Sequence, residues 1–461
     1  MGKKTVPTFH TRSVCVSLGL AFLLSFSGAA LGQSSGGSFQ LTNSVVAGGG
    51  GASNDGANNR FSHDSTVGEH AAGTLLRNPP FSQTAGFRAG NIGLVPTAAP
   101  GEISGQVTKA DGTPLAGVTV RLNGTQTRLT ITDSNGNYNF SEVETNGFYT
   151  ITPSRVNYTF SPTNRSFSLT GAHTEASFTA AANGDHLNPL DTTEYFVRQQ
   201  YLDFLNREPD HAGLEYWSNR INQCGEDQSC NRTQRIGVSN AFFFELEFQQ
   251  TGAYVFRLHR AAFGNNQPGP NPDSSNLAEA RSLPSYAVFV SDRARVVGGA
   301  GLAQSQLALA NILVQRTEFV VKYPTSLDGQ SFVDAVLTTI RDDSGVDLSS
   351  ERIALMTLSN SGGRAAVMYR LADDNVGTNR INNRVFIDQE YNRALVATQY
   401  FGYLRRNPDM AGFLFWLGQV NSAPFKDVAR QHAMVCSFVT SAEYQQRFSP
   451  VVTHTNGECA P

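Results

Sequence analysis

The sequence has little that points to nucleic acid or to a membrane. Its 461 residues carry 35 basic and 38 acidic side chains, so the formal net charge is −3 and no basic surplus is available for a phosphate backbone. Beyond an apolar leader, no run approaches the roughly 18 apolar residues that a spanning helix needs. We therefore expect no nucleic-acid partner and no transmembrane segment in the mature chain.

The sequence also lacks catalytic and metal-binding motifs. Its nine histidines are scattered, and neither His-Glu-x-x-His nor Gly-x-Ser-x-Gly occurs. The glycines at 298–301 are not followed by the Lys-Ser/Thr pair of a phosphate loop. His259 and His432 lie in helical segments with apolar neighbours, which favours a packing or surface role. We expect a non-enzymatic protein without a cofactor, although a site assembled from distant residues would leave no such motif.

Cysteine is scarce, and its distribution fits an exported protein. Of five cysteines, Cys15 lies in the apolar leader, which leaves an even number of four. An even count in an exported chain predicts two disulfides. Cys224 and Cys230 would close a short polar loop. Cys436 and Cys459 would hold the C-terminus, although the pairing itself does not follow from the sequence. The alternative, a metal site, is disfavoured because Cys-x-x-Cys and a suitably spaced histidine are both missing.

The first 32 residues have the pattern of a secretory signal peptide. Lys3, Lys4 and Arg12 precede an apolar run over residues 14–26, and Ala-Leu-Gly at 30–32 is a small-x-small cleavage site. No cysteine follows this site, so a lipoprotein anchor is not expected. The pattern predicts a secreted or cell-surface protein.

Residues 33–100 are rich in glycine, serine and asparagine, and two interpretations stay open. A bland linker or stalk is the default for this composition. Short pieces such as 37–41 and 80–87 instead have the character of extended segments separated by glycine turns. They favour a small β module.

Residues 101–183 alternate apolar and polar side chains between turn signals. The alternation is clear at Val118, Val120 and Leu122, and again at Tyr138 and Phe140. A period of two residues is that of a strand with one buried face. The segment is therefore predicted to form an all-β domain.

Three motifs in this segment resemble the carboxypeptidase regulatory-like domain. They are Gly-x-Val at 105–107, Asp-Gly-x-Pro-Leu-x-Gly-Val-x-Val at 111–120 and Thr-Asp-x-x-Gly-x-Tyr-x-Phe at 132–140. The resemblance implies a seven-stranded, transthyretin-like sandwich, grouped with carbohydrate-binding-like folds and used as a non-catalytic spacer or accessory binding unit. Asp133, Asn135 and Gly136 are expected to serve the turn, with a calcium site as the lesser alternative.

An internal repeat organises the second half of the chain. Residues 200–217 return as residues 399–416, with Gln, Tyr, Leu, Arg, Pro, Asp, Ala, Gly and Trp in the same order and spacing. The only two tryptophans of the chain, Trp217 and Trp416, end the two copies. A repeat of this kind defines the architecture of the region.

Each copy predicts a helix, a short turn and a second helix. Pro209 should end the first helix, and Asp210 should cap the second. Gly213 should admit a neighbouring helix, and Trp217 should pack in the core. Arg207, just before this turn, is expected to hold the capping aspartate or a neighbouring carboxylate. The corresponding positions of the second copy are Arg406, Asp409, Gly412 and Trp416.

The repeated unit resembles the domain of unknown function 4214 family. The unit is Arg-x-Pro-Asp-x-x-Gly-φ-x-x-Trp, followed by Phe-x-x-x-x-Glu-Phe at 242–248 or Phe-x-x-x-x-Glu-Tyr at 438–444. The resemblance covers about residues 190–448. It implies a helical module, similar to phycobilisome linker domains and common in secreted and surface proteins, with no enzymatic activity. Residues 254–264 and 332–341 look like degenerate copies, with Asp347 in the place of Asp210.

Together these patterns predict a multidomain protein. An all-β seven-stranded sandwich over residues 101–183 is followed by an all-α, repeat-derived helical domain over residues 190–461, with two clear and two degenerate repeats. The predicted function is that of a secreted or cell-surface binding or structural protein. Its helical domain would contact an unknown surface polymer or extracellular protein. The alternative is a carbohydrate-binding protein that acts through the sandwich.

Overall fold

The computed structural model describes residues 100–269, 281–374 and 381–459, together with the backbone of five short strands between residues 35 and 84. Contacts divide the chain into two compact units, Met1–Ala89 and Gly90–Pro461. The predicted signal peptide, residues 1–32, lies outside the described residues.

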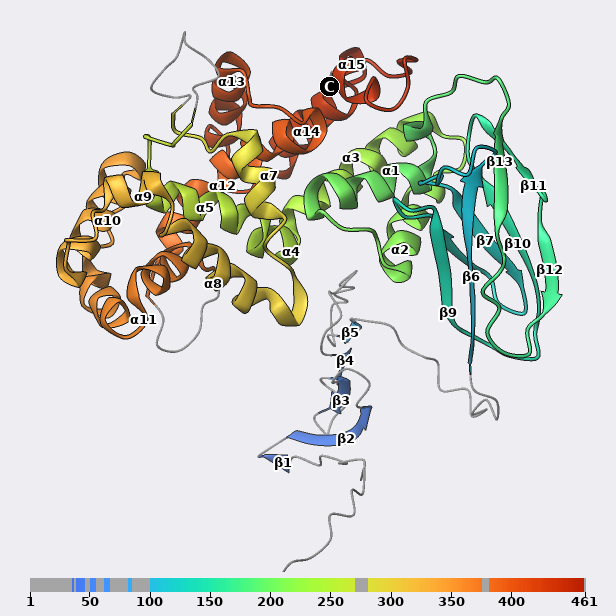
Figure 1. Ribbon diagram of the computed structural model, residues 1–461, viewed down its shortest axis with the longest axis horizontal. Helices are drawn as coiled ribbons and strands as arrows, with labels where there is room; N and C mark the ends of the chain where they lie inside the picture. Colours follow the sequence, from blue (N-terminus) through green and yellow to red (C-terminus); the bar gives the residue numbers. More distant parts are fainter. Residues whose placement is uncertain are drawn as a thin grey trace, which may run out of the picture. The chain divides into compact units, whose positions relative to one another are not determined.

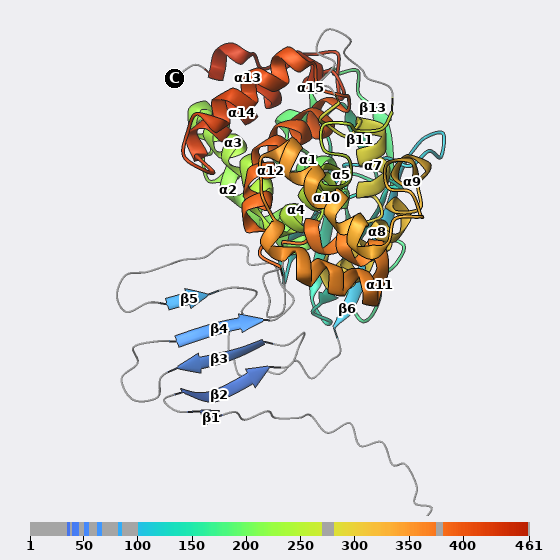
Figure 2. The same cartoon turned by 90° about the vertical axis from the view of Figure 1, so that its left-hand side faces the viewer.

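The short strands of the first unit form one sheet in the order β1-β2-β3-β4-β5 (Figure 2). Neighbouring strands pair antiparallel except β4 and β5, which run parallel. The strands are β1 (Ser35–Gly36), β2 (Phe39–Val45), β3 (Gly50–Asn54), β4 (Ser62–Thr66) and β5 (Ser82–Thr84).

The second unit begins with a sandwich of two four-stranded sheets, ordered β12-β10-β7-β8 and β11-β13-β6-β9 (Figure 1). Its side-chain alternation builds the core, because Val120, Leu122, Tyr149 and Ile151 all point inward and are buried. The strands are β6 (Gly101–Lys109), β7 (Thr119–Gly124), β8 (Arg128–Ile131), β9 (Asn137–Val143), β10 (Phe148–Ser154), β11 (Tyr158–Ser161), β12 (Arg165–Ser168) and β13 (Phe178–Ala182).

The sandwich has eight strands, not the seven that the family resemblance implied. From β10 to β13 the chain passes to the other sheet at each successive strand. β11 pairs with β13 in one sheet, and only a few residues later β12 pairs with β10 in the other. β11 and β12 are thus short edge strands of two different sheets.

The turn at 133–136 is built as its residue types predict. Asp133 accepts hydrogen bonds from the backbone N–H groups of Asn135 and Asn137, both at 2.8 Å. Gly136 has a φ of +73°, a conformation that costs glycine little. The carboxylate of Asp133 is thus engaged in the turn itself.

The rest of the unit is mostly helical, and one hydrophobic core connects its helices. The helices are α1 (Thr193–Gln200), α2 (His211–Asn222), α3 (Gln228–Phe244), α4 (Leu246–Gln250), α5 (Gly252–Phe263), α7 (Tyr286–Arg293), α8 (Leu302–Leu313), α9 (Thr317–Lys322), α10 (Gly329–Ser344), α11 (Arg352–Ala372), α12 (Arg384–Gln399), α13 (Met410–Asn421), α14 (Val428–Val439) and α15 (Ala442–Gln445). Short 3₁₀ turns include η1 (Pro189–Asp191) and η7 (Asn456–Cys459), and π-helical turns η2 (Tyr201–Leu205) and η6 (Tyr400–Leu404) follow α1 and α12.

Two sequence predictions about the middle helices need correction. The apolar periodicity of residues 302–321 predicts a single helix, but the structure has two, α8 and α9, with Arg316 extended as the N-cap position of α9. Asp347 was expected to take the role of Asp210. It accepts from the backbone N–H of Ser349 at 2.8 Å, but the element that follows is a 3₁₀ turn, Ser349–Glu351.

The sandwich and the helices share apolar contacts within the second unit. Leu129 and Ile131 of β8 belong to the same hydrophobic cluster as α1 and α2. His211, at the start of α2, stacks on Phe140 with ring centroids 5.8 Å apart. The two predicted domains are therefore parts of one compact unit.

Candidate functional site

The two sequence repeats share a local geometry that begins with a capped turn. α1 and α12 both end in a π-helical turn, η2 or η6, and then in a left-handed residue, Asn206 or Arg405, each with a φ of +53°. The helix thus ends before the proline, three residues earlier than the sequence prediction. Asp210 and Asp409 then accept from the N–H of Gly213 and Gly412, both at 2.8 Å, as N-caps.

The arginine of each copy joins the two halves of the sequence motif. Arg207 Nε and Nη2 each donate to Glu247 at 2.8 Å, and Arg207 also lies 3.4 Å from the Asp210 carboxylate. Arg406 holds Glu443 in the same two-pronged way, at 2.6 and 3.0 Å. Both glutamates come from the later Phe-x-x-x-x-Glu element, so each motif closes on itself through a bidentate ion pair.

The two tryptophans are only partly buried, unlike the prediction that they would be core residues. Trp217 packs against the helical core, with its ring centroid 5.9 Å from that of Phe242. Trp416 also packs against the core, next to Phe415, which is exposed. These positions contribute to packing without forming a shared aromatic surface.

The two copies face each other across their π-helical turns. Phe204 and Tyr403 occupy equivalent positions, and their ring centroids lie 4.8 Å apart. The fully buried carboxylate of Asp203 receives Arg447 at 2.9 Å and Arg405 at 3.2 Å. α3 of the first copy and α14 of the second are also in contact.

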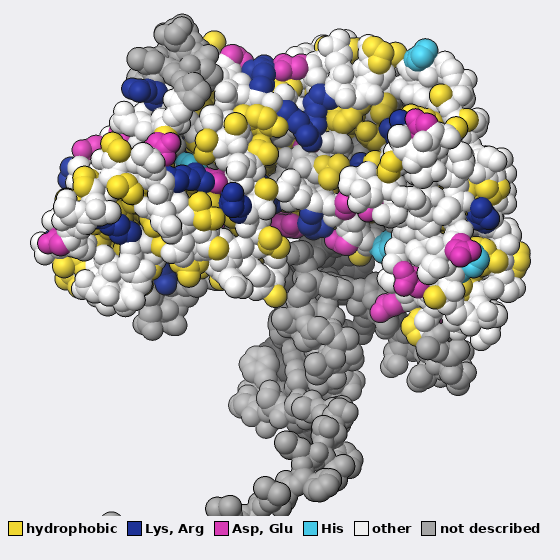
Figure 3. All heavy atoms as spheres, viewed as in Figure 1, with side chains coloured by type: hydrophobic (Ala, Val, Ile, Leu, Met, Phe, Trp, Pro, Cys, Tyr) yellow, Lys and Arg dark blue, Asp and Glu magenta, His cyan; other side chains and the backbone are white. Residues whose placement is uncertain are grey.

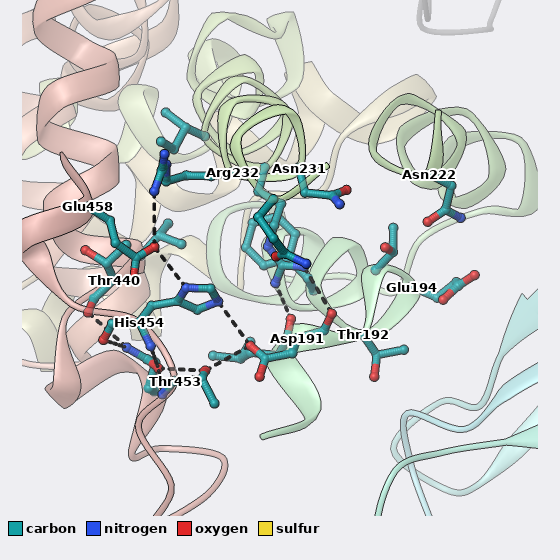
Figure 4. A pocket seen from close by; sticks show the side chains of 18 of the residues that line it. Asp191, Thr192, Glu194, Asn222, Asn231, Arg232, Thr440, Thr453, His454 and Glu458 are labelled. Atoms are coloured by element: carbon teal, nitrogen blue, oxygen red, sulfur yellow. Dashed lines mark hydrogen bonds and ion pairs between the residues drawn. The ribbon is translucent and has the colours of Figure 1, made fainter. Parts of the chain in front are cut away.

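Between these elements lies a polar hollow with a volume of about 860 Å³ (Figure 4). We call this space the braced hollow. One wall is the end of α2 and the start of α3, and the other is the C-terminal tail that follows α15. Its polar lining comprises Arg121, Asp191, Thr192, Thr193, Glu194, Asn222, Gln228, Asn231, Arg232, Arg235, Thr440, Gln445, Thr453, His454 and Glu458.

A disulfide flanks each wall of the braced hollow. Cys224–Cys230 closes the loop that carries Gly225 and Gln228, and Cys436–Cys459 attaches the tail directly after Glu458. The corresponding loop of the second copy, residues 422–427, contains no cysteine. The disulfides that flank the braced hollow are therefore not a general feature of the repeat.

Ion pairs connect the tail to η1 and to α3. His454 lies between two carboxylates, with Nε2 3.3 Å from Asp191 and Nδ1 3.1 Å from Glu458 (Figure 4). Arg232 of α3 approaches Glu458 at 3.6 Å. Thr453 donates to Asp191 at 3.0 Å. The tail is thus held by charge as well as by a disulfide.

The same contacts shift the pKa values of the three titratable groups. The hydrogen bond with Asp191, and then that with Glu458, raises the pKa of His454 despite partial burial. Burial alone would raise the pKa of Asp191, but hydrogen bonds from His454 and Thr453 outweigh it, so that pKa is lowered. The pKa of Glu458 is lowered in the same way, by the backbone N–H of Thr455 and by His454.

These shifts predict that the tail is held most firmly between about pH 4.5 and pH 6.5, the unfolded-state values of the carboxylates and the imidazole. The raised pKa of His454 means that its contribution is lost as pH rises through the folded value. The contributions of Asp191 and Glu458 are lost as pH falls through their lowered values. Hydrogen exchange of the Thr453 and His454 amides, which both donate to Gln445 Oε1, measures this directly. The protection ratio between wild type and His454→Gln should shrink from pH 6 to pH 9, and a constant ratio would contradict the assignment.

The disulfide at the tail makes a separate prediction. Replacing Cys436 and Cys459 by serine opens a loop with a sequence separation of 23, which costs about 3 kcal/mol in the chain-entropy account. The amides of residues 451–459 should lose protection at the same time. The matched control is the double serine variant of Cys224 and Cys230, which opens a loop with a separation of only 6 and leaves the tail attached. Equal loss of tail protection in both variants would show that the hollow does not depend on its own disulfide.

The four disulfide cysteines are predictable from the sequence, but the braced hollow is not. Its lining comes from η1 and α3 and from the tail, which lies more than two hundred residues later in the sequence, and these segments carry no shared motif. The only available signal was the position of the cysteines themselves. The predicted structural residues Asp210, Gly213, Asp409 and Gly412 serve the turns of the repeat and do not line the hollow.

Comparison with protein families agrees with the order of domains predicted from the sequence. Residues 102–183 match the carboxypeptidase regulatory-like domain, and residues 184–230 match the domain of unknown function DUF4214. The second match includes α1, η2, α2 and the first disulfide. No curated protein matches the chain.

Two further findings bear on the chemistry available. Within the described residues, no helix is both long and apolar enough to cross a bilayer. In the same residues, no group of three or more histidine, cysteine or acidic side chains is arranged to hold a metal ion.

Proposed function

We propose that the protein is an exported, non-enzymatic binding protein whose helical region contacts a surface polymer or an extracellular protein through the braced hollow. The observation that carries this proposal is the placement of both disulfides at the walls of one polar hollow. Disulfides are stable in oxidising compartments, which supports a secreted or cell-surface location. A ligand-binding surface needs fixed walls, because ordering mobile walls on binding would reduce the affinity.

The charge pattern also supports this function. Figure 3 shows basic and acidic side chains interspersed over the visible face, without a large patch of one sign. The formal net charge of −3 agrees with that picture. A surface of this kind does not favour nucleic acid, whose binding depends on a basic footprint.

We further propose that the two copies of the helical repeat arose by duplication. Both contain the π-helical turn, the left-handed residue, the aspartate cap and the bidentate Arg–Glu pair at the same spacing. The two copies contact each other through Phe204 and Tyr403, so the helical region consists of two related halves packed together. The braced hollow would then have formed at the edge of the contact between the two copies.

The sandwich has a specific candidate surface for the alternative function, carbohydrate binding. An open hollow of about 690 Å³ lies on β6 and β9 beside the start of α2. Its lining includes the exposed amides of Asn137 and Asn139. The resemblance of the sandwich to carbohydrate-binding-like folds makes this surface a reasonable second candidate.

One binding experiment separates the two functions. The full chain, produced in an oxidising compartment, is tested for binding to washed envelopes of the cells that make it. Asn222→Trp, which fills the braced hollow, should reduce binding at least about tenfold, equivalent to about 1.4 kcal/mol. Asn219→Trp is the matched control, because Asn219 is an exposed residue of the same helix outside the lining. Loss of binding only in Asn139→Trp would favour the sandwich, and no binding by wild type would refute the proposal.

A further inference from the structure

The charges of the braced hollow are already paired with one another. Among the carboxylates, Asp191 and Glu458 hold His454, and Glu194 holds Arg121 of the sandwich. Among the guanidinium groups, Arg232 approaches Glu458. An ionic ligand would have to break these pairs, because each carboxylate of the lining already has a cationic partner.

Arg235 is also engaged, although it has no carboxylate partner in the hollow. Its guanidinium donates to the backbone carbonyl groups of Leu190 and Asp191 and lies 4.2 Å from the ring centroid of Phe196. Its role is to fix η1 against α3. The Arg235 guanidinium, whose charge would otherwise attract an anion, therefore points into the wall of the hollow.

The groups that remain for a ligand are neutral hydrogen-bonding groups. In the part of the chain that the structure describes, the side chains of Asn222 and Gln228 have no hydrogen-bond partner, and both are exposed. The hydroxyl groups of Thr192 and Thr193 line the same space, and Thr192 caps no backbone N–H. In Figure 4, Asn222 lies across the hollow from the ion pairs of His454.

Three of the large apolar residues of the lining are buried. Leu190, Phe196 and Tyr444 are each at most 4% exposed and form the floor beneath the polar groups. Ile236 and Val439, which are partly exposed, are the other apolar residues of the lining. The volume of about 860 Å³ is in the usual range of small-ligand sites, roughly 300–1,000 Å³.

We infer that the braced hollow binds a neutral, polyhydroxylated ligand, a short segment of uncharged glycan. Hydroxyl groups both donate and accept, and therefore complement amide and threonine side chains without disturbing the ion pairs. This inference rests on the proposed function and names the class of polymer. It differs from the alternative function, which places sugar binding on the sandwich.

Calorimetric titration of the full oxidised chain tests this inference with four neutral trisaccharides and one anionic probe. The neutral probes are cellotriose, maltotriose, mannotriose and N,N′,N″-triacetylchitotriose, and the anionic probe is trigalacturonate. We expect at least one neutral trisaccharide to bind, with a Kd that changes less than about twofold between 0.05 and 0.5 M NaCl, since no charge is screened. Asn222→Ala should weaken that binding about fivefold, which corresponds to one lost hydrogen bond. Asn219→Ala should leave it unchanged.

Three results would overturn the inference. They are failure of all four neutral probes, salt-sensitive binding of trigalacturonate in their place, and a loss of neutral-glycan binding in Asn139→Ala that Asn222→Ala does not share. The envelope experiment with Asn222→Trp gives an independent answer. If it succeeds while the neutral probes fail, the hollow binds a different class of ligand and the proposed function stands. If both fail, both proposals fall.

Discussion

Glu390→Gln is expected to destabilise the helical region by about 3–5 kcal/mol, because it leaves a buried guanidinium without its counter-charge. Arg260 on α5 and Glu390 on α12 are both about 1% exposed at their side chains. Arg260 Nε donates to Glu390 at 2.9 Å, and Nη2 donates to the second carboxylate oxygen at 3.2 Å. The substitution keeps the size of the side chain, so the loss reports on charge and not on a cavity.

The surroundings of Arg260 explain why the pair would resist replacement by apolar residues. The same guanidinium donates to the backbone carbonyl groups of Gly264, Ser282 and Asp343. Removing it would leave buried carbonyl groups without partners, each at a cost of about 1–3 kcal/mol. We therefore expect Arg260→Met combined with Glu390→Leu to stay well below wild type in stability.

Urea unfolding followed by tryptophan fluorescence measures the effect. Both tryptophans of the chain, Trp217 and Trp416, lie in the helical region, so the sandwich adds no tryptophan signal. Asp342→Asn is the control, because Asp342 and its partner Arg341 are each 57% exposed and a surface pair contributes little. A loss below about 1 kcal/mol for Glu390→Gln would contradict a structural role for this pair.

The limits of sequence reasoning are visible at particular residues. Local signals, such as the alternation at Val120 and Leu122 or the cap at Asp210, depend on neighbours within one turn or strand and were predictable. The strand count was wrong because seven strands were taken from the family resemblance, and the sheet that β11 and β12 each join is set by tertiary pairing. The braced hollow depends on the contact between Asp191 and His454, which no local sequence pattern predicts.

The Arg–Glu pairs lie between these two cases. The sequence predicts that Arg207 holds a carboxylate and contains the glutamate of the later motif, but no local pattern indicates that these two residues pair. The connection needs α3 to turn back so that Glu247 reaches Arg207. The second copy, with Arg406 and Glu443, makes the same connection, which indicates that the spacing of the motif encodes this closure.

Gly213→Ala tests the closest packing in the repeat and should destabilise the helical region by about 1–3 kcal/mol, the usual cost of overpacking. A Cβ atom at this position would lie 2.1 Å from the hydroxyl oxygen of Tyr201. The tyrosine cannot swing aside easily. It is 4% exposed, and its ring centroid lies 4.9 Å from that of Phe242 and 4.8 Å from the guanidinium carbon of Arg207.

The hydroxyl group is the cause of the clash, so its removal should restore much of the lost stability. With Tyr201→Phe, the nearest ring carbon to the new methyl group is 3.1 Å away, a contact that small adjustments relieve. In a double-mutant cycle, the combined variant should therefore lose less than Gly213→Ala and Tyr201→Phe added together. Simple additivity would show that the glycine is required for another reason.

A second glycine provides a control whose replacement should change the stability in the opposite direction. Gly237 lies within α3, where a Cβ atom would meet nothing within 4 Å. Gly237→Ala should stabilise the helix by about 0.5–1 kcal/mol, because alanine loses less backbone entropy. Gly412→Ala in the second copy should behave like Gly213→Ala, since its Cβ would lie 2.3 Å from the hydroxyl oxygen of Tyr400. Opposite signs at these positions would establish that the repeat keeps its glycine for the approach of one tyrosine.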